Sequence, residues 1–371
     1  MEKTVFSATA PTPFNGTVEN ISETIRTPHF FAAANSEKGF VSFFEDVFGG
    51  NDIERLFILG GGPGSGKSTM MKKVGEISEK EGFTTEYIHC SSSPLSLDGV
   101  IVREKKTAVI DGTSPHIYIP RAAGVREINI DPGAAWDTDA LFSHREKIFS
   151  LTDAKKSEYR KAYIYLRAAG LLYKEMRDTV LPYVLEEKLK NNVRNIFQNT
   201  ASKKVGTGKG HVRIQRAVSG AGNIYFESLS KMAQRTYLVA DYRGIAHIYM
   251  GELLHAAQKA GVEYTVSYDP EDITLADGIL FNAAGVAFTM YAKSFDKRIN
   301  CERFADKDAL SNMRQKYIFA ARSRSSLLAE AYDALKGAAK FHDCIEKEYA
   351  DCTDFSVTEH ISRNLCERIF G

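Results

Sequence analysis

RLFILGGGPGSGKSTMMKKVGEISEKEG, residues 55–82, contains the pattern that decides the fold. The apolar run 56–59 predicts a buried parallel strand. Residues 61–68 match the whole phosphate-loop (P-loop) pattern G-x-x-x-x-G-K-[ST]. Apolar residues then recur at helical spacing, and Gly82 is suited to end the helix. Strand, loop and helix predict an α/β fold, with a parallel sheet flanked by helices, of the P-loop NTPase kind.

The chemistry of this loop follows from its residue types. Glycines let successive backbone N–H groups point at one anion, and the start of the helix adds partial positive charge. Lys67 is expected to reach the β and γ phosphates, and Ser68 to hold Mg²⁺. A chance glycine-rich turn is the plain alternative, and the flanking strand and helix argue against it. The predicted ATP-binding residues are Gly61, Gly62, Pro63, Gly64, Ser65, Gly66, Lys67, Ser68 and Thr69.

A second acid is expected beside the loop. In KKTAVIDGTSPH, residues 105–116, an apolar strand ends in Asp111, which we interpret as a second Mg²⁺ ligand. An acidic turn residue is the alternative. Lys67, Asp111 and His116 are the candidate catalytic residues, with His116 or Glu104 positioning the attacking water. His89 or Cys90, at the end of another expected strand, could contact nucleotide or substrate.

The chain contains an internal repeat. RTYLVADYRGIAHIYMGELLHAAQKAG, residues 235–261, aligns with the opening stretch at an offset of 180 residues (235 − 55). LDGVIV, residues 97–102, matches ADGILF, residues 276–281, and WDTDALFSHREK, residues 136–147, matches ADKDALSNMRQK, residues 305–316. Matches that keep their order over both halves indicate duplication. The fold expected is therefore a tandem of P-loop NTPase-like α/β domains, each followed by a helical segment.

The repeat also suggests domain boundaries. We expect an N-terminal extension at 1–28, an active α/β core at 29–150, a helical segment at 151–200 that Pro182 interrupts, and a basic linker at 201–212. A degenerate α/β core at 213–305 and a helical segment with a C-terminal tail at 306–371 complete the chain. Charge-rich helices of this kind are more typical of packing or dimerisation than of catalysis.

The two copies differ at the residues that phosphate chemistry needs. The changes are Gly61 to Asp241, Gly66 to Ala246, Lys67 to His247, Ser68 to Ile248 and Asp111 to Met290. The second copy is therefore not expected to bind Mg-nucleotide, unless His247 or Arg243 restores a phosphate contact. Both copies keep an Asp-Gly pair, at 98–99 and 277–278. We interpret these pairs as turn residues of the fold, which weakens Asp98 as a catalytic base.

Composition limits the remaining possibilities. The 371 residues suggest two domains, and a net charge of +1 gives no support for bulk electrostatic binding of nucleic acid or an anionic membrane. Five cysteines without C-x-x-C spacing favour neither a disulfide framework nor a zinc ribbon, so a cytoplasmic location is expected. Residues 1–16 lack the apolar run of a signal peptide, and ADGILFNAAGVAFTMYA, residues 276–292, reads as buried strands rather than a membrane span.

The motifs HFFAAANSEKGF, GGPGSGKST, HCSSSPLSLDGV and DGTSPH, in this order, resemble an uncharacterised bacterial family of tandem P-loop NTPases, identified only as ATPases or nucleotide-binding proteins. The resemblance runs from Arg26 onward and implies ATP binding; both loops tend to be intact in that family, whereas the second is degenerate here. Three functions stay open. The first is an Mg-ATP-dependent ATPase, in which Arg103, Arg121, Arg126 or Arg243 is a candidate arginine finger acting in trans. The second is a kinase with a small acceptor, for which residues 120–129 suggest an arginine-rich lid, and the third is a non-catalytic nucleotide switch or scaffold. The substrate or protein partner, and any homo-oligomer, are not specified by the sequence.

Overall fold

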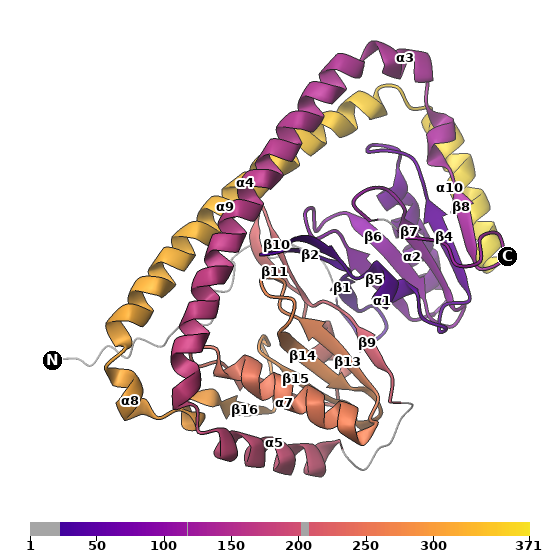
Figure 1. Cartoon of the computed structure of the whole chain (residues 1–371). Helices are drawn as coiled ribbons and strands as arrows, with labels where there is room; N and C mark the ends of the chain where they lie inside the picture. The colour runs from indigo at the N-terminus through magenta and orange to yellow at the C-terminus, as the bar shows by residue number, and fades with distance from the viewer. Residues whose placement is uncertain (1–22, 117, 202–207) are drawn as a thin grey trace.

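The computed structural model describes residues 23–116, 118–201 and 208–371, and it is an α/β molecule with two six-stranded sheets flanked by helices (Figure 1). The first sheet has the order β1-β5-β6-β7-β4-β8, and the second has the matching order β9-β13-β14-β15-β12-β16. The first set of strands is β1 His29–Phe31, β4 Arg55–Leu59, β5 Thr85–His89, β6 Leu97–Val102, β7 Thr107–Asp111 and β8 Glu127–Ile130. The second set is β9 Gly210–Val212, β12 Arg235–Ala240, β13 Tyr264–Tyr268, β14 Ala276–Phe281, β15 Val286–Thr289 and β16 Lys297–Asn300.

Both sheets are mixed and mostly parallel, so the expectation of a parallel sheet is met in part. β6 runs antiparallel to β5 and β7, and β14 runs antiparallel to β13 and β15. The connections explain the difference, because only residues 103–106 separate β6 from β7. A parallel crossover needs a dozen residues or more, whereas a short turn reverses the chain.

The same accessory elements flank each sheet, as the sequence repeat predicts. A hairpin and a short helix precede the β-strand that leads to each loop. They are β2 Ala33–Ser36, β3 Gly39–Ser42 and α1 Phe44–Phe48 in the first repeat, and β10 Arg216–Ser219, β11 Gly222–Tyr225 and α6 Ser228–Met232 in the second. The helix after each loop is α2 Lys67–Lys80 or α7 Ile245–Ala260. We call residues 29–200 the first repeat and residues 210–370 the second.

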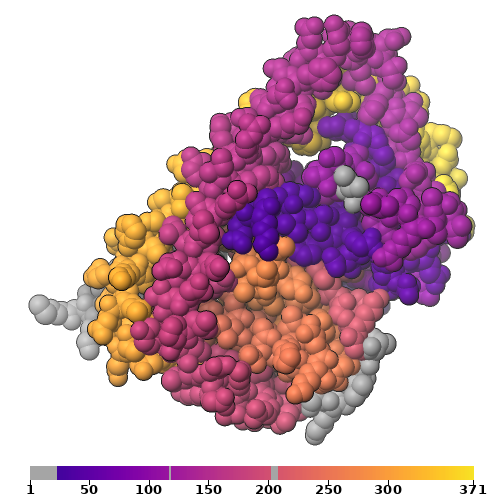
Figure 2. All heavy atoms as spheres, viewed as in Figure 1, coloured from indigo at the N-terminus to yellow at the C-terminus, as the bar shows by residue number. Residues whose placement is uncertain are grey.

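Two long helices dominate the shape of the molecule (Figure 1). α4 (Arg145–Val180) has 36 residues and α9 (Arg314–Ala350) has 37, so each is about 55 Å long. They pack along each other in opposite directions: Lys155 of α4 lies beside His342 of α9, and Glu158 of α4 lies against Gly337. Figure 2 shows α4 passing over the N-terminal strands of the first repeat, where Tyr163 donates a hydrogen bond to Asn35.

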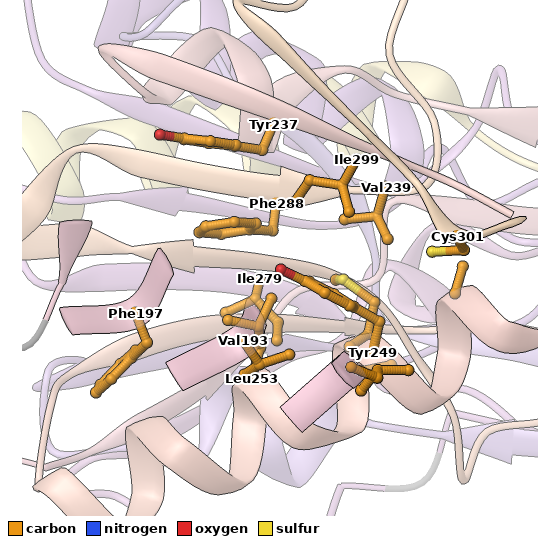
Figure 3. Close-up of a cluster of buried hydrophobic side chains, with 14 of the residues drawn as sticks. Val193, Phe197, Tyr237, Val239, Tyr249, Leu253, Ile279, Phe288, Ile299 and Cys301 are labelled. Carbon is orange, nitrogen blue, oxygen red and sulfur yellow. The ribbon is translucent and has the colours of Figure 1, made fainter. Parts of the chain in front are cut away.

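The long helices lead to a reciprocal exchange of the helices that follow them. α5 (Glu186–Thr200) belongs to the first repeat in sequence, yet Val193 and Phe197 pack in the second core with Leu253 and Ile279 (Figure 3). α10 (Phe355–Phe370) returns the exchange, because Leu365 and two neighbours pack in the first core. Each core is therefore completed by a helix from the other repeat. The remaining short elements are α3 Thr138–Ser143, α8 Lys307–Ser311 and the 3-10 turns η1 Pro132–Ala135, η2 Leu181–Tyr183, η3 Asn282–Ala284 and η4 Cys301–Phe304.

The two repeats also meet at the edges of their sheets. Phe31 and Ile214 exchange two backbone hydrogen bonds, of 2.7 and 3.2 Å. The buried carboxylate of Glu86 accepts from Arg213 at 2.7 Å and from Arg103. A buried acid with two guanidinium partners is stable only while both remain in place, so this ion cluster fixes the contact between the repeats.

Several sequence expectations can be placed on these elements. The strands expected at 56–59, 86–88 and 107–110 are β4, β5 and β7, and residues 276–292 include β14 and β15. Pro182 interrupts the helical segment as expected, but the helix begins at Arg145, and the expected C-terminal tail is the helix α10. Residues 1–22 of the N-terminal extension and 202–207 of the basic linker fall outside the described residues. Within the part of the chain that the structure describes, no helix has the apolar length needed to cross a membrane.

Candidate functional site at the loop edge of the first sheet

The glycine-rich loop begins where β4 ends and leads into α2. Gly61, Gly64 and Gly66 all have positive φ angles, of 84°, 71° and 80°. L-amino acids with a side chain rarely adopt this conformation, so the loop needs these glycines to curl. Gly66 is the N-cap of α2, and no side chain caps the helix. The first N–H groups of α2 therefore remain available to an anion.

Lys67 is held over the loop by two oxygen partners. Its Nζ donates to the backbone carbonyl of Gly62 at 2.6 Å and lies 3.8 Å from Oδ2 of Asp111. The side chain is 8% exposed, so the ammonium group faces the interior of the loop. Ser65 Oγ donates to the same Gly62 carbonyl at 2.9 Å and closes the loop.

Ser68, in the first turn of α2, and Asp111, the last residue of β7, have the donor chemistry that Mg²⁺ prefers. β4 pairs in parallel with β7, with Leu59 opposite Asp111. Oδ1 of Asp111 accepts from the Thr113 N–H at 2.8 Å and its hydroxyl at 2.6 Å, which leaves Oδ2 directed to Lys67. Ser68 Oγ accepts from the Leu97 N–H at 3.0 Å, so its hydroxyl oxygen is oriented by the backbone. Carboxylate and hydroxyl oxygens are suitable ligands for Mg²⁺ or its bound waters.

Asp98 is part of this edge, so its interpretation as a turn residue is wrong. It lies inside β6, buried, with Oδ2 3.4 Å from Nε2 of His116. The neighbouring Gly99 is needed for packing, because a Cβ there would lie 2.6 Å from the Phe48 ring. Burial raises the pKa of Asp98 to about 6; the charge of His116 opposes this rise and that of Asp111 adds to it.

His116 is buried rather than at an open surface. Its ring stacks on Phe44 with centroids 4.8 Å apart and meets the edge of Phe40 at 5.2 Å. The imidazole Nδ1 has no hydrogen-bond partner although it is buried. His116 is thus brought to the site edge, and its partner there is Asp98.

Helices from the second repeat form a roof over the loop. A Cβ on Gly64 would lie 2.5 Å from the backbone oxygen of Glu346 in α9, and one on Gly66 would lie 3.0 Å from Thr358 in α10. The pKa of Glu346 is lowered, first by His342 and further by the charge of Lys67 and the N–H of Gly64. The first loop is therefore in contact with an acid supplied by the other repeat.

A surface pocket lies beside Trp136, whose ring is near Gly62 of the loop. It has a volume of about 500 Å³ and lies between η1, α3 and the turn from α9 to α10. Trp136 lines this pocket, and its ring would lie 3.3 Å from a Cβ on Gly62. The buried indole N–H of Trp136 has no partner. An unpaired buried donor next to a pocket is a suitable contact for a polar ligand group.

The second loop is closed by its own side chain. Asp241 replaces Gly61, and its carboxylate accepts from the N–H of Gly244 at 2.9 Å and from that of Ala246 at 2.9 Å. These are N–H groups at the start of α7, where the first repeat leaves its own available. A negative charge already occupies the position where a phosphate would bind, and Arg177 of α4 packs on Gly244 from outside.

Buried ion pairs fill the rest of the second site. Arg216, 2% exposed, bonds to Asp269 and to Glu271 and lies 3.7 Å from Asp277. His247 stands in the lysine position with Nε2 3.4 Å from Asp269. Burial lowers the pKa of His247, but the carboxylates of Asp269 and Asp241 raise it by more. His247 is thus paired with acids inside the protein. Its position gives no support to the expectation that it could bind phosphate in place of the lysine.

Other side chains that the sequence suggested lie elsewhere. Glu104 follows β6 at the opposite edge of the sheet and accepts from Thr84. Arg103 and Arg126, considered as arginine fingers, are paired with Glu86 and Glu127. Two further candidates are also engaged, since Arg121 pairs with Glu45, and the guanidinium of Arg243 lies over the rings of Tyr242 and Tyr317. His89 is buried, with its imidazole bonded to His29 and to the Pro94 carbonyl, whereas Cys90 is partly exposed beside Asp98.

Sequence reasoning missed Asp98, Trp136 and Glu346 as parts of the site. A signal existed for Asp98, because an acid inside the apolar run LDGVIV is expensive to bury without a purpose. No signal pointed to Glu346, which reaches the loop only through the path of α9.

Comparisons with family models, with curated proteins and with solved structures gave no match to this chain.

Proposed function

We propose that the protein is an Mg-ATP-binding P-loop ATPase, with the nucleotide site in the first repeat and a closed, non-binding counterpart in the second. One observation carries the proposal. The same loop occurs twice in one chain, and only the first has unoccupied N–H groups at the helix start, together with a lysine and an acid at the next strand end. This contrast supports binding of a polyphosphate at the first loop.

The residues have distinct roles in this proposal. The N–H groups of 61–69 surround the β and γ phosphates, and Lys67 exchanges its Gly62 contact for phosphate oxygens. Ser68 and Asp111 would hold Mg²⁺, and the ion would supply positive charge beside the γ phosphate. Asp98 lies near enough to Asp111 and Lys67 for both charges to act on its carboxyl group. We assign His116 no part in the phosphate step, because its Nε2 faces Asp98.

The pocket beside Trp136 is the proposed place of the nucleoside. Trp136, one of the lining residues, lies near Gly62 of the loop, and the pocket volume of about 500 Å³ lies within the usual range for small-molecule sites. Trp136 is the only tryptophan of the chain, so its fluorescence reports on this pocket alone.

The alternative functions receive different support. The stretch 120–129 suggested an arginine-rich kinase lid, but Arg121 and Arg126 bond to Glu45 and Glu127, at the start of β8, away from the loop. A nucleotide-dependent switch is supported by one observation, the contact of α9 and α10 with Gly64 and Gly66. Hydrolysis coupled to movement of these helices would combine ATPase and switch.

ATP turnover tests the proposal. Phosphate release should exceed that of a Lys67→Ala protein, and it should depend on Mg²⁺. An equal rate for wild type and variant would contradict the ATPase. A phosphorylated small molecule formed from a metabolite mixture, without matching phosphate release, would instead favour the kinase. Tight ATP binding without turnover would favour the switch.

A further inference from the structure

A cluster of three potential metal ligands lies beside the phosphate loop. Cys90 follows β5, Asp98 lies in β6 and His116 follows β7, so three different elements bring them together. One ligand atom from each residue lies within 4.8 Å of the other two. Asp98 and His116 are buried, whereas Cys90 is partly exposed and leaves a route from solvent. Among the described residues, the structure brings together one group of three potential metal ligands, and it is this cluster.

The cluster has unused bonding capacity. Oδ2 of Asp98 is buried and lacks a hydrogen-bond partner, and so does Nδ1 of His116. Burial raises the pKa of the Cys90 thiol, and the backbone N–H groups of Ser93 and Ser92 oppose that rise only in part. Buried polar atoms are almost always paired, so an unpaired carboxylate oxygen between a thiol and an imidazole calls for an explanation.

In the second repeat, a cationic side chain lies at the position that corresponds to this cluster. Asp269 and Asp277 correspond to Cys90 and Asp98, each at an offset of 179 residues (269 − 90 and 277 − 98). The guanidinium of Arg216 lies between these two acids. Arg216 is the first residue of its hairpin, and the first residue of the hairpin in the first repeat is Ala33. Arg216, which lies between the two acids of the second repeat, therefore has no arginine counterpart in the first repeat.

We propose that Cys90, Asp98 and His116 bind a thiophilic divalent cation of the Zn²⁺ class, which takes the place that Arg216 fills in the second repeat. Thiolate, imidazole and carboxylate are the ligands that Zn²⁺ selects, and three protein ligands leave one position for water or substrate. Ligand atoms of a tetrahedral zinc site are roughly 3.3–3.8 Å apart, so the cluster closes by about 1 Å at its widest.

Binding changes the protonation of the ligands. Burial raises the pKa of Cys90, so the free sulfur carries a proton. Formation of the metal–sulfur bond requires the thiolate, and the displaced proton passes to the buffer. The carboxyl group of Asp98 likewise binds as carboxylate. The site does not depend on nucleotide, so its test is independent of the proposed ATPase.

Co²⁺ is a suitable spectroscopic probe, because a sulfur ligand gives it a charge-transfer band that oxygen ligands do not. Chelator-treated full-length protein, without nucleotide, should bind one equivalent of Co²⁺ with this band, and Zn²⁺ should displace it. Cys90→Ser should abolish the band, and His116→Gln should weaken binding by at least about 100-fold. Cys344→Ser, which removes an exposed cysteine on α9, should leave the charge-transfer band and the Co²⁺ affinity unchanged.

The outcomes separate the possibilities. A wild-type titration without the sulfur band overturns the proposal, even if Cys90→Ser fails to fold. A band that survives Cys90→Ser and disappears in Cys344→Ser also overturns it, because the metal would then lie on α9. If the proposal is correct, proton release should accompany Zn²⁺ binding in weak buffer, and Zn²⁺ should raise the unfolding temperature of wild type but not of Cys90→Ser. Absence of both effects would overturn the proposal.

Discussion

At the scale of single residues, the loop glycines differ in what surrounds them. Gly64 and Gly82 have similar φ angles, of 71° and 80°. A Cβ at Gly82 meets nothing within 4 Å, whereas one at Gly64 would lie 2.5 Å from the backbone oxygen of Glu346. The pair therefore separates the cost of backbone strain from the cost of a collision between the two repeats.

Gly64→Ala should lower the free energy of unfolding by about 2–4 kcal/mol, since backbone strain of about 1–2 kcal/mol adds to overpacking against α9. The matched control Gly82→Ala should lose only the strain, about 1–2 kcal/mol. Chemical denaturation of both proteins measures the difference. Equal losses would show that the loop does not bear on α9.

Glu346 is an acid at a position that a triphosphate would approach. Its carboxylate is influenced by Lys67 and by the N–H of Gly64. Glu346→Gln should tighten Mg-ATP binding roughly fivefold, because removal of one like charge about 4 Å away is worth on the order of 1 kcal/mol where water screens the interaction. Glu330→Gln, an exposed position on α9, should leave the affinity unchanged. Weaker binding in Glu346→Gln would instead indicate a direct contact of this acid with Mg²⁺ or its waters.

At the scale of elements, the two loop-and-helix units show how a binding element becomes a structural one. Asp241 satisfies N–H groups at the start of α7, as an N-cap residue does. Asp241→Ala should therefore lower the free energy of unfolding by about 1–2 kcal/mol. It should not create a second ATP site, because the lysine and the metal ligands are still missing. Denaturation and ATP titration check the two parts, with Asp333→Ala as an exposed control; ATP bound at the second loop would refute the account of that loop.

The exchanged helices give a prediction about each core. Leu365 of α10 is 1% exposed and packs in the first core. Leu365→Ala should cost about 2–4 kcal/mol, and hydrogen exchange should rise in β4 and α2 rather than in β12 and α7. Arg363→Ala, on the exposed face of α10, is the control. Faster exchange confined to the second repeat would contradict the exchange of helices.

Much of the secondary structure could be predicted from the sequence, because apolar runs and glycines at 55–82 and 105–116 are local signals. The role of Asp98 could not, because an Asp-Gly pair is usually a turn signal, and here Gly99 serves the ring of Phe48. The positions of α5 and α10 could not either. An amphipathic face shows that a helix is buried, but it does not show which of two similar cores buries it.

At the scale of the whole molecule, the reciprocal exchange makes the two repeats depend on each other. α9 starts beside the second core and ends on the first loop, and α4 runs the opposite way to place Arg177 on the second loop. A ligand at the first loop therefore meets Glu346, Tyr349 and Thr358, all from the second repeat. In the second repeat, Asp241 occupies the loop and Arg216 fills the neighbouring site with ion pairs. This repeat supports the helices α9 and α10, which cover the first loop.

The central claim is that Mg-ATP binds at the first loop alone. Equilibrium dialysis with Mg-ATP, paired with the fluorescence of Trp136, measures stoichiometry and place together. We expect one nucleotide per chain, a change in tryptophan fluorescence, affinity lowered about 10- to 100-fold in Lys67→Ala, and no change in His247→Ala. Two nucleotides per chain, or binding that persists unchanged in Lys67→Ala, would contradict the account.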